Sequence, residues 1–430
     1  MRLTEVTPER LAGVDPSQVD LFDPEFHAGG DPHTVWAAMR ERAPLHLSRL
    51  PDGRSFHSVT RYHDACQVLG NHREFTSERG SLLNQLGHGD AAAGKMLVAT
   101  DPPRHSELRR PLNRMFTGRG LARSEHRIRA AVRALLARAL DGERAPDGER
   151  SLDGEPFDLA REATMLPMAI AGALMDLPEP DWADLVQWTG MAAAPQDPVF
   201  MIRNSHATLA IAHHRLFEYF EQQYEARKGT EGDDAFRLLM TMRDGELTRE
   251  EVVVNCYSLL LGANATTPHT VAGTVLALIE RPEQFRAVRE NPDLIPGLVE
   301  EGLRWTSPAS SFLRYATEDV ELSGGTVPKG GAVAVWVGSA NRDADVFPDP
   351  YRFDVTRQEN RHIAFGYGAH YCLGATVARL TLRIFFEEVL DTVEEFTLAG
   401  EPRHLTSNFV AGLTGLPVLA RARRTAEATA

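Results

Sequence analysis

The residue types with the clearest chemistry lie in ten consecutive positions, FGYGAHYCLG over residues 365–374. Gly366, Gly368 and Gly374 permit left-handed backbone conformations and close approach of other backbone atoms. A tight loop can therefore surround Cys372 and direct N–H groups at its sulfur. The residues that follow have a helical pattern, and the positive end of a helix dipole favours a thiolate. This combination predicts a thiolate that binds a soft metal, because an ordinary buried cysteine needs neither the glycines nor the nearby histidine.

A second stretch with chemical potential is a long, mostly apolar segment over residues 250–281. It is apolar on every side, which predicts a helix buried along its length. Gly262 and Ala263 have small side chains that leave room for a ligand beside one turn. Thr266 follows Gly262 by four residues and so shares its face. Its hydroxyl can face that space, bond back to the carbonyl four residues earlier, as is common within helices, or do both at once.

Two pairs of charged side chains have helical spacing. His105 and Arg109 lie four residues apart in DPPRHSELRR, and Glu301 and Arg304 lie three apart. On an exposed helix the first pair would be a solvated basic face. The second would be a surface ion pair that contributes little stability. Other roles for these four residues require that both helices be buried.

The stretch over 365–374 resembles the haem-binding loop of the cytochrome P-450 family, F-G-x-G-x-H-x-C-x-G, at every fixed position. The resemblance covers nearly the whole chain. It implies a mainly α fold with a small β region, in one domain over 1–430, with haem b between the long central helix and the helix after the cysteine loop. Cys372 would be the axial thiolate ligand of the iron. The loop residues expected to contact haem are Phe365, Gly366, His370, Cys372 and Gly374, with His370 bonded to a propionate.

The resemblance also implies roles for charged residues outside the loop. His105, Arg109 and Arg314 would bind the haem propionates, because cations neutralise buried carboxylates. Glu301 and Arg304 would form a buried pair behind the haem. We expect the later arginine that joins this pair to be Arg352, which completes a structural network holding the cysteine loop.

The remaining expectations concern the substrate side of the haem. Thr266 and Ala263 would lie at the oxygen-binding face, with Thr266 supporting proton delivery. Residues expected to line the substrate space are Leu97, Val98, Gly262, Ala309, Phe312 and Val410. Of these, Leu97 and Val98 belong to an irregular stretch over 78–99, where the alternative interpretation is plain disorder.

The sequence departs from the family's pattern at two positions of the central helix. The acidic residue that usually precedes the threonine is replaced by Ala265. Pro268 cannot donate to the carbonyl of Asn264, and its ring clashes with that carbonyl. We therefore predict a kink beside Thr266. A water on the freed carbonyl, the Asn264 side chain or a substrate group would then replace the missing acid.

Composition limits the partners and the compartment. The chain has 430 residues and a net charge of −14, which argues against nucleic acid as a partner. Its three cysteines imply no disulfide framework, and no apolar run is long enough to cross a membrane. We expect a cytoplasmic protein without membrane contact, and a monomer as the family's default. Residues 1–30 are expected to form an N-terminal arm, 141–156 a surface loop and 421–430 a flexible tail.

These expectations converge on a haem-thiolate monooxygenase. It would use O2 and two electrons from a ferredoxin and an NAD(P)H-dependent reductase to oxidise an apolar small molecule, free or tethered to a carrier protein, in bacterial secondary-metabolite biosynthesis. The ferredoxin is expected on the cysteine side, at a basic patch formed by Arg109, Arg110, Arg114 and Arg361. One alternative is peroxide-driven or otherwise atypical oxidation, motivated by Ala265. A more distant alternative is a haem sensor or electron carrier without catalytic activity.

Overall fold

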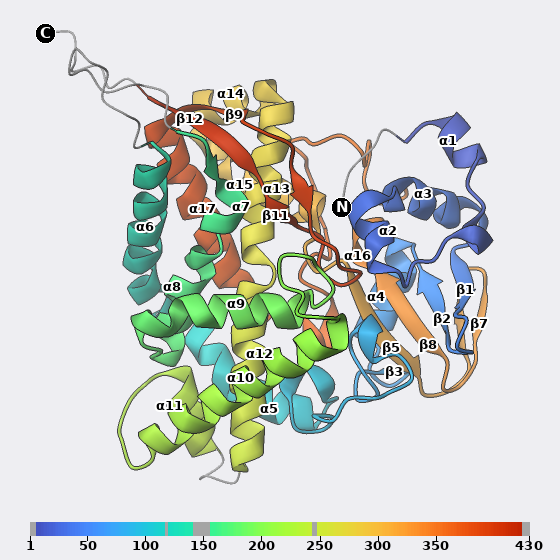
Figure 1. The fold of residues 1–430 in the computed structure, drawn as a ribbon. Coiled ribbons are helices and arrows are strands. Elements are labelled where there is room, and N and C mark those ends of the chain that lie inside the picture. Colours follow the sequence, from blue (N-terminus) through green and yellow to red (C-terminus); the bar gives the residue numbers. More distant parts are fainter. Residues whose placement is uncertain (1–5, 117–118, 141–154, 243–246, 424–430) are drawn as a thin grey trace, which may run out of the picture.

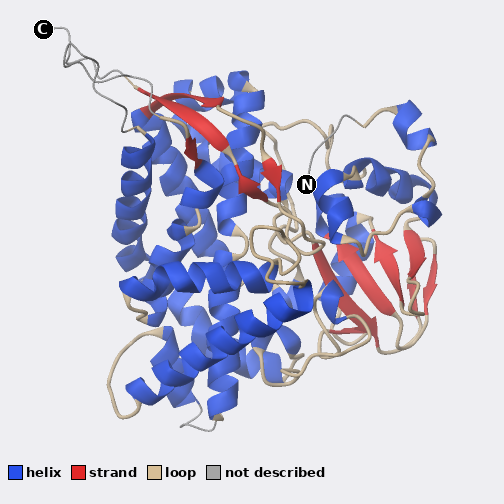
Figure 2. Cartoon of the chain, viewed as in Figure 1, coloured by secondary structure: helices blue, strands red, loops and turns tan. Residues whose placement is uncertain are grey.

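The structure is a computed structural model that describes the chain except residues 1–5, 117–118, 141–154, 243–246 and 424–430. Helices occupy most of it, and strands gather mainly beside the N-terminal helices (Figures 1 and 2). The helices are α1 (Pro8–Ala12), α2 (Pro24–Gly29), α3 (Pro32–Arg42), α4 (Tyr62–Gly70), α5 (Arg104–Asn113), α6 (Arg119–Ala139), α7 (Leu159–Glu162), α8 (Met165–Met175), α9 (Trp182–Ala193), α10 (Ser205–Arg227), α11 (Ala235–Thr241), α12 (Arg249–Asn264), α13 (Thr267–Glu280), α14 (Pro282–Glu290), α15 (Ile295–Thr306), α16 (Val337–Ala340) and α17 (Ala375–Thr392). The strands are β1 (Leu45–Arg49), β2 (Ser55–Val59), β3 (Phe75–Thr76), β4 (Phe157–Asp158), β5 (Ser311–Ala316), β6 (Val320–Leu322), β7 (Gly325–Val327), β8 (Ala332–Trp336), β9 (Val393–Leu398), β10 (Arg403–His404), β11 (Leu413–Gly415) and β12 (Pro417–Ala422).

The largest sheet joins segments from both ends of the chain in the order β1-β2-β8-β5-β3. The β2–β8 pair is parallel and the other pairs are antiparallel. Its inward side chains pack with helix α3, where Trp36 and Trp336 are fully buried with ring centroids 5.5 Å apart. The predicted mainly helical fold with a small β region is therefore confirmed.

The two ends of the chain are more structured than the sequence suggested. The expected N-terminal arm contains α1 and α2, and it buries Leu21 and His27 in the core. At the other end, the first two residues of the expected flexible tail over 421–430 belong to β12, where Arg421 pairs with Glu395 at 2.8 Å, while 424–430 lie outside the described residues. This correction follows from pairing between β12 and β9, a contact distant enough in sequence to leave no local pattern. Most of the expected loop over 141–156 lies outside the described residues.

The apolar segment over 250–281 forms two helices rather than one kinked helix. Thr248 and Glu251 cap the start of α12 reciprocally, and α12 ends at Asn264. Helix α13 starts at Thr267, which puts Pro268 in its first turn, where a missing N–H costs nothing. The regular backbone ladder ends with the bond from the N–H of Ala265 to the carbonyl of Leu261, 2.9 Å long. The proline therefore starts a new helix, which interrupts the segment more strongly than predicted.

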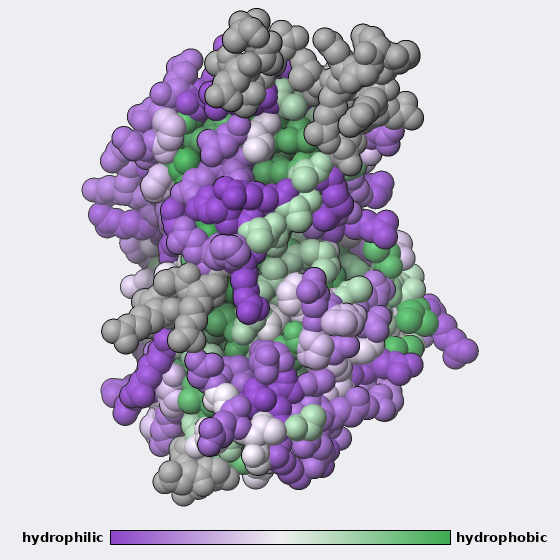
Figure 3. Space-filling view, turned by 90° about the vertical axis from the view of Figure 1, so that its left-hand side faces the viewer, coloured by the Kyte–Doolittle hydropathy of each residue, from purple (hydrophilic) through white to green (hydrophobic). Residues whose placement is uncertain are grey.

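Charged side chains cover the outer helices. The face drawn in Figure 3 is mainly hydrophilic. On α6, Arg129 donates to Glu387 and Glu388 of α17 at 2.8 and 2.7 Å, and Arg133 adds a bond of 2.8 Å to Glu388. Within the described part of the chain, no helix combines the length and apolar character that crossing a bilayer requires.

Candidate active site

The cysteine loop has the geometry of a sulfur cradle. Gly366 and Gly368 adopt φ values of 74° and 73°, as predicted, whereas Gly374 has φ −87° and gains nothing from being glycine in this respect. A Cβ on Gly368 would lie 2.6 Å from the Cα of Gly70, so the loop and the end of α4 are in backbone contact. The N–H of Cys372 donates to the carbonyl of Phe365 at 2.8 Å, which closes the loop.

Burial and the neighbouring charges have opposite effects on the pKa of the Cys372 thiol. Burial is the largest influence and leaves the pKa of the thiol raised, although the N–H of Gly374, which donates to the sulfur, and the charges of Arg109 and Arg379 act in the opposite direction. Arg379, on α17, lies with its Cζ 4.6 Å from the ring centroid of Phe365 and donates to both oxygens of Glu300. Donors and cations around a partly buried sulfur are the surroundings in which proteins stabilise a thiolate.

Four side chains predicted to bind the propionates come from three distant segments and influence one another's pKa values. They are His105, Arg109, Arg314 and His370. The rings of His105 and His370 have centroids 4.4 Å apart. Both ring nitrogens of His105 are buried without a hydrogen-bond partner. Burial, together with the smaller effects of the charges of His370 and Arg109, lowers the pKa of His105 to about 4. Arg314 is 4% exposed, and burial lowers its pKa to about 10.

Among the described residues, no carboxylate pairs with Arg109 or Arg314. The single hydrogen bond recorded for Arg314 goes to the neighbouring carbonyl of Leu313, at 2.8 Å. Buried charges are normally paired, because the cost of desolvating them is otherwise uncompensated. The protein therefore builds a cationic site in which the charge of Asp101 acts on Arg314 from a distance, but no described carboxylate pairs directly with either arginine.

Asp101 holds His370 in place, and sequence reasoning did not assign it this role. Its carboxylate accepts from Thr76 Oγ1 at 2.5 Å and from Ser77 Oγ at 2.7 Å, and it lies 3.7 Å from His370 Nε2. Burial raises the pKa of Asp101, but its close approach to His370 and the bonds from Thr76 and Ser77 outweigh burial and leave the pKa lowered. The sequence signal that could have pointed to Asp101 is its position just before the two prolines that precede His105.

The ion pair of α15 is fully buried, as the resemblance implied. Arg304 donates through Nε and Nη2 to the two oxygens of Glu301, at 2.8 and 2.7 Å. The side chain that joins them is Arg357, whose Nε lies 3.1 Å from Glu301 Oε2. Arg352 was the wrong choice, because it contributes only its backbone carbonyl to Arg304 and Arg357. The two arginines lie five residues apart in an irregular segment, where spacing does not determine side-chain direction.

At the break between α12 and α13, Gly262 faces open space. A Cβ on it would meet nothing within 4 Å. Thr266 Oγ1 lies 3.5 Å from the carbonyl of Gly262, which is at the limit of a hydrogen bond and leaves the hydroxyl available. Ala265 is buried with apolar neighbours, including Ala194 and Val410.

Asn264 does not approach Thr266 in the way that a substitute for the acid requires. Its amide nitrogen lies 3.3 Å from Thr189 Oγ1 on α9 and 3.5 Å from the sulfur of Met168 on α8. Its side-chain oxygen is buried without a partner. The neighbouring helices therefore hold this amide, and the predicted catalytic role of Asn264 finds no support in these contacts.

The structure brings some of the predicted substrate-lining residues together. Ala309 and Val410 form an isolated antiparallel bridge. Val410 has no exposed surface, so it belongs to the wall and does not line open space. The partly exposed residue of that hairpin is Phe409, whose ring centroid lies 6.3 Å from that of Phe312. The prediction therefore chose the neighbour of the more exposed residue, because spacing does not determine which side chain of an irregular segment points outward.

Leu97 and Val98 lie in a short 3-10 helix, Leu97–Ala99, that is attached to α12. The N–H of Leu97 donates to Asn255 Oδ1 at 2.8 Å. Leu97 is buried, and Val98 is 42% exposed. The stretch expected to be irregular or disordered is therefore an ordered loop against the central helix.

These observations fit a haem. Arg314, which bonds to a backbone carbonyl and to no described carboxylate, and the unpaired His105 suit the two propionates, and the N–H of Gly374 and the charge of Arg109 suit a thiolate ligand. The space beside Gly262 suits a ligand on the opposite face. The residues that would hold the group are Cys372, His370, His105, Arg109 and Arg314.

Comparison with known proteins gives one family. The model of the family Cytochrome P450 matches residues 197–403. Cytochrome P450 NovI of Streptomyces niveus is 31% identical over 96% of this chain and 98% of its own length. Cytochrome P450 monooxygenase PikC of Streptomyces venezuelae is 33% identical over 93% of this chain and 92% of its own length.

The solved structures agree. The crystal structure of P450 OxyD, which is involved in the biosynthesis of vancomycin-type antibiotics, superposes with a TM-score of 0.83. It is 32% identical and covers 94% of this chain and 100% of its own. With Cys372 in its glycine loop, the chain belongs to the cytochrome P450 family, whose members bind haem through a cysteine thiolate, and is a P450 monooxygenase.

Proposed function

We propose that this monooxygenase uses O2 and two electrons from a ferredoxin and its NAD(P)H-dependent reductase to oxidise an apolar small molecule in bacterial secondary-metabolite biosynthesis. The observation that carries the proposal is the cradle around Cys372 beside cations that lack a protein anion. When bound, haem with a thiolate ligand supplies cleavage of the O–O bond and insertion of oxygen into a C–H bond. Everything else depends on how this chain orients the group and the substrate.

The propionate side is assigned to three segments. Arg109 of α5 and Arg314 of β5 would donate to the carboxylates, and His370 would donate while Asp101 fixes its ring. Because Arg314 is buried and Arg109 is half-buried, these bonds would form in surroundings less polar than water, where a charge-assisted bond is stronger. These contacts would set the position of the macrocycle relative to Thr266.

Thr266 is the residue we assign to proton delivery. Its hydroxyl shares a face with Gly262 and is only weakly engaged by the carbonyl there. An acid at position 265 would lie among Ala194, Leu405 and Val410, where an ionised carboxylate is costly. Water next to the broken helix is therefore the most suitable source of protons.

The absence of an acid at position 265 also favours a second candidate function, oxidation driven by hydrogen peroxide. Peroxide brings both oxygen atoms, both electrons and two protons to the iron, so it reduces the dependence on a proton relay. The apolar surroundings of Ala265 support this alternative. Turnover with peroxide as fast as turnover with reduced ferredoxin would replace the first proposal by the second.

The substrate space supports an apolar substrate. Phe312 and Phe409 meet edge to face, and Ala309 lies beside them. Such walls reward burial of hydrocarbon at about 25 cal/mol per Å². The participation of OxyD in antibiotic biosynthesis supports a secondary metabolite as the class, free or carried by a protein.

The electron donor is assigned to the surface beside α5. Arg73 and Arg110 line one shallow hollow there, and both are exposed. Arg361, expected in this patch, is 70% exposed and pairs with Glu359 at 2.7 Å, so part of its charge is already neutralised. An acidic ferredoxin would be steered by Arg73 and Arg110. Arg110→Glu should lower the rate driven by ferredoxin several-fold, most at low salt, and leave peroxide-driven turnover unchanged.

The decisive test of the proposal uses Cys372. The reduced haem protein with carbon monoxide should show the red-shifted Soret band of thiolate ligation, and Cys372→Ser should lose both this band and product formation. Cys66→Ser is the matched control, since Cys66 is a partly buried free cysteine outside the loop. A wild-type protein that contains haem but gives neither the band nor NAD(P)H-dependent product would refute the proposal.

A further inference from the structure

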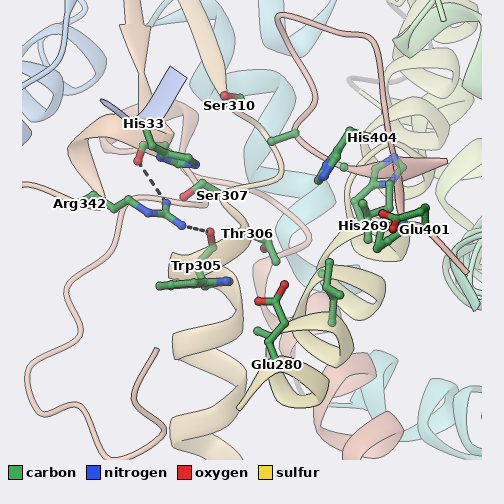
Figure 4. A pocket seen from close by; sticks show the side chains of 18 of the residues that line it. His33, His269, Glu280, Trp305, Thr306, Ser307, Ser310, Arg342, Glu401 and His404 are labelled. Carbon is green, nitrogen blue, oxygen red and sulfur yellow. Dashed lines mark hydrogen bonds between the residues drawn. The ribbon is translucent and has the colours of Figure 1, made fainter. Parts of the chain in front are cut away.

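A second cavity lies apart from the cysteine loop. It has a volume of about 410 Å³ and is bounded by the first turn of α3, one side of α13, the end of α15 and the segment around β10 and β11 (Figure 4). It lies behind the substrate wall. Ala309 and Val410 form the bridge in that wall, and the next residues along the chain, Ser310 and Ala411, line this cavity. The cavity is therefore separate from the haem site, although it shares two segments with it.

One wall of the cavity carries a buried arginine without a counterion. Arg342 is 2% exposed, and its Nη2 donates to the carbonyl of Trp305 at 2.6 Å. Its Nε is buried without a partner, and among the described residues no carboxylate pairs with it. Burial is the largest cause that lowers its pKa, to about 9. By contrast, Arg304 on the other side of Trp305 is bonded to Glu301 through two nitrogens.

Two further polar atoms beside Arg342 lack partners. Ser310 has no exposed surface and its Oγ is unpaired, and His33 is 5% exposed with an unpaired Nδ1. Figure 4 shows both side chains on the same side of the cavity as Arg342. Unpaired buried polar atoms cost free energy unless a ligand or water satisfies them. A guanidinium suits a carboxylate, which accepts charge-assisted hydrogen bonds from it.

The opposite side of the cavity has the opposite charge. Glu401 and His404 lie across from Arg342, and Glu280 lies below (Figure 4). Glu280 shares its carboxylate with Arg281 at 2.9 Å, and Glu401 has an exposed side chain. Two carboxylates at the rim repel a doubly charged anion such as phosphate and attract an amine. Between the two ends, Leu276 and Leu413 offer an apolar surface.

We infer that this cavity is a second small-molecule site that binds a zwitterion, with its carboxylate on Arg342 and its amine at Glu401 and Glu280. Its hydrocarbon body would lie along Leu276. This inference does not rest on the proposed oxidation, because binding is measured without turnover.

The test uses the haem-loaded protein and calorimetric titration with 4-aminobutanoate, 6-aminohexanoate and 8-aminooctanoate. We expect one of them to bind with one molecule per chain and at least ~tenfold more tightly than the carboxylate and the amine of equal length, since each of these lacks one charge-assisted contact. The Soret band should not shift, because the cavity does not include the haem site. Equal binding of the simple carboxylate, absence of binding by all three, or competition with imidazole at the iron would overturn the inference.

Two variants locate the site without touching Arg342, whose bond to Trp305 also supports the end of α15. Glu401→Gln should weaken binding of the best zwitterion about tenfold by removing one charge-assisted contact, and the matched surface change Glu231→Gln should have no effect. Leu276→Trp should fill the cavity and abolish binding while the band with carbon monoxide is retained. Unchanged binding in both Glu401→Gln and Leu276→Trp would place the ligand elsewhere.

Discussion

Two buried arginines of this protein, Arg304 and Arg314, lie in different electrostatic surroundings although both are almost inaccessible to solvent. Arg304 donates to both oxygens of Glu301, and Arg357 completes a closed network. Arg314 has one bond, to the carbonyl of Leu313. The first set satisfies its charges within the protein and serves as scaffold. The second leaves a buried charge without a directly paired carboxylate among the described residues, with only the more distant charge of Asp101 acting on it, so it suits a bound anion.

The largest effect that tests this contrast should come from the closed network. Glu301→Gln removes the carboxylate between two arginines and leaves both charges buried, which should cost roughly 3–5 kcal/mol of unfolding free energy. Urea unfolding of the purified protein measures this loss, and the same variant should retain less haem.

Arg352→Ala is the matched control, because only the backbone carbonyl of Arg352 takes part in the network. We expect its unfolding free energy to stay within about 0.5 kcal/mol of the wild type. A large loss in Arg352→Ala, or none in Glu301→Gln, would contradict the division between scaffold and binding site.

The next effect concerns Arg314, the buried arginine that has no directly paired carboxylate among the described residues. Arg314→Met removes a buried charge that has no protein partner, so the haem-free protein should be as stable as the wild type or more stable. Haem binding should weaken at least tenfold, since a hydrogen bond to a charged group contributes about 1.5–3 kcal/mol. Haem transfer to apomyoglobin measures the second quantity, and Arg361→Met is the exposed control. A destabilised haem-free protein would show that Arg314 is scaffold.

A smaller effect should appear in the pH dependence of His105. Burial lowers its pKa to about 4, below the value of about 6.5 expected in the unfolded chain. Between these values the unfolded chain binds more protons, so the stability of the haem-free protein is complete above pH 6.5 and falls as the pH decreases. One such group changes the unfolding constant at most tenfold per pH unit. His105→Gln should reduce this dependence in urea unfolding at pH 7.5 and 5.

His27 sharpens the same measurement. Its pKa is also lowered to about 4 by burial, but its Nε2 bonds to the carbonyl of Leu21, far from the cationic site. In the haem-free protein, His27→Gln and His105→Gln should have similar effects. With haem bound, only His27→Gln should still matter, because a propionate favours protonated His105. Equal effects in the haem-bound protein would remove His105 from the site.

The cysteine loop could be predicted from the sequence because its determinants are local. Gly366 and Gly368 need positive φ whatever the rest of the chain does, and the structure confirms both. The general fold followed from the family resemblance. We expected one kinked helix, and the structure has two separate helices. Pro268 fits without cost in the first turn of the second helix, which allows the complete break.

Side-chain direction in irregular segments was beyond reach. Arg357 rather than Arg352 reaches Glu301, and Phe409 rather than Val410 faces Phe312. In both cases the neighbouring residues have similar chemistry, and tertiary contacts decide which one points inward. The cavity at Arg342 was missed for a related reason. Its lining residues come from segments that lie far apart in the sequence, so no sequence motif brings them together.

The gap between α12 and α13 has a consequence for how rates should respond to acidity. Past Ala265, the carbonyls of Gly262, Ala263 and Asn264 face no N–H of a continuing helix. Peptide oxygens do not titrate in the range where enzymes work, unlike a carboxylate. Water molecules hydrogen-bonded to these carbonyls would transfer protons equally well at every pH in that range. We therefore expect a flat profile of oxidation rate against pH and a pronounced slowing in heavy water.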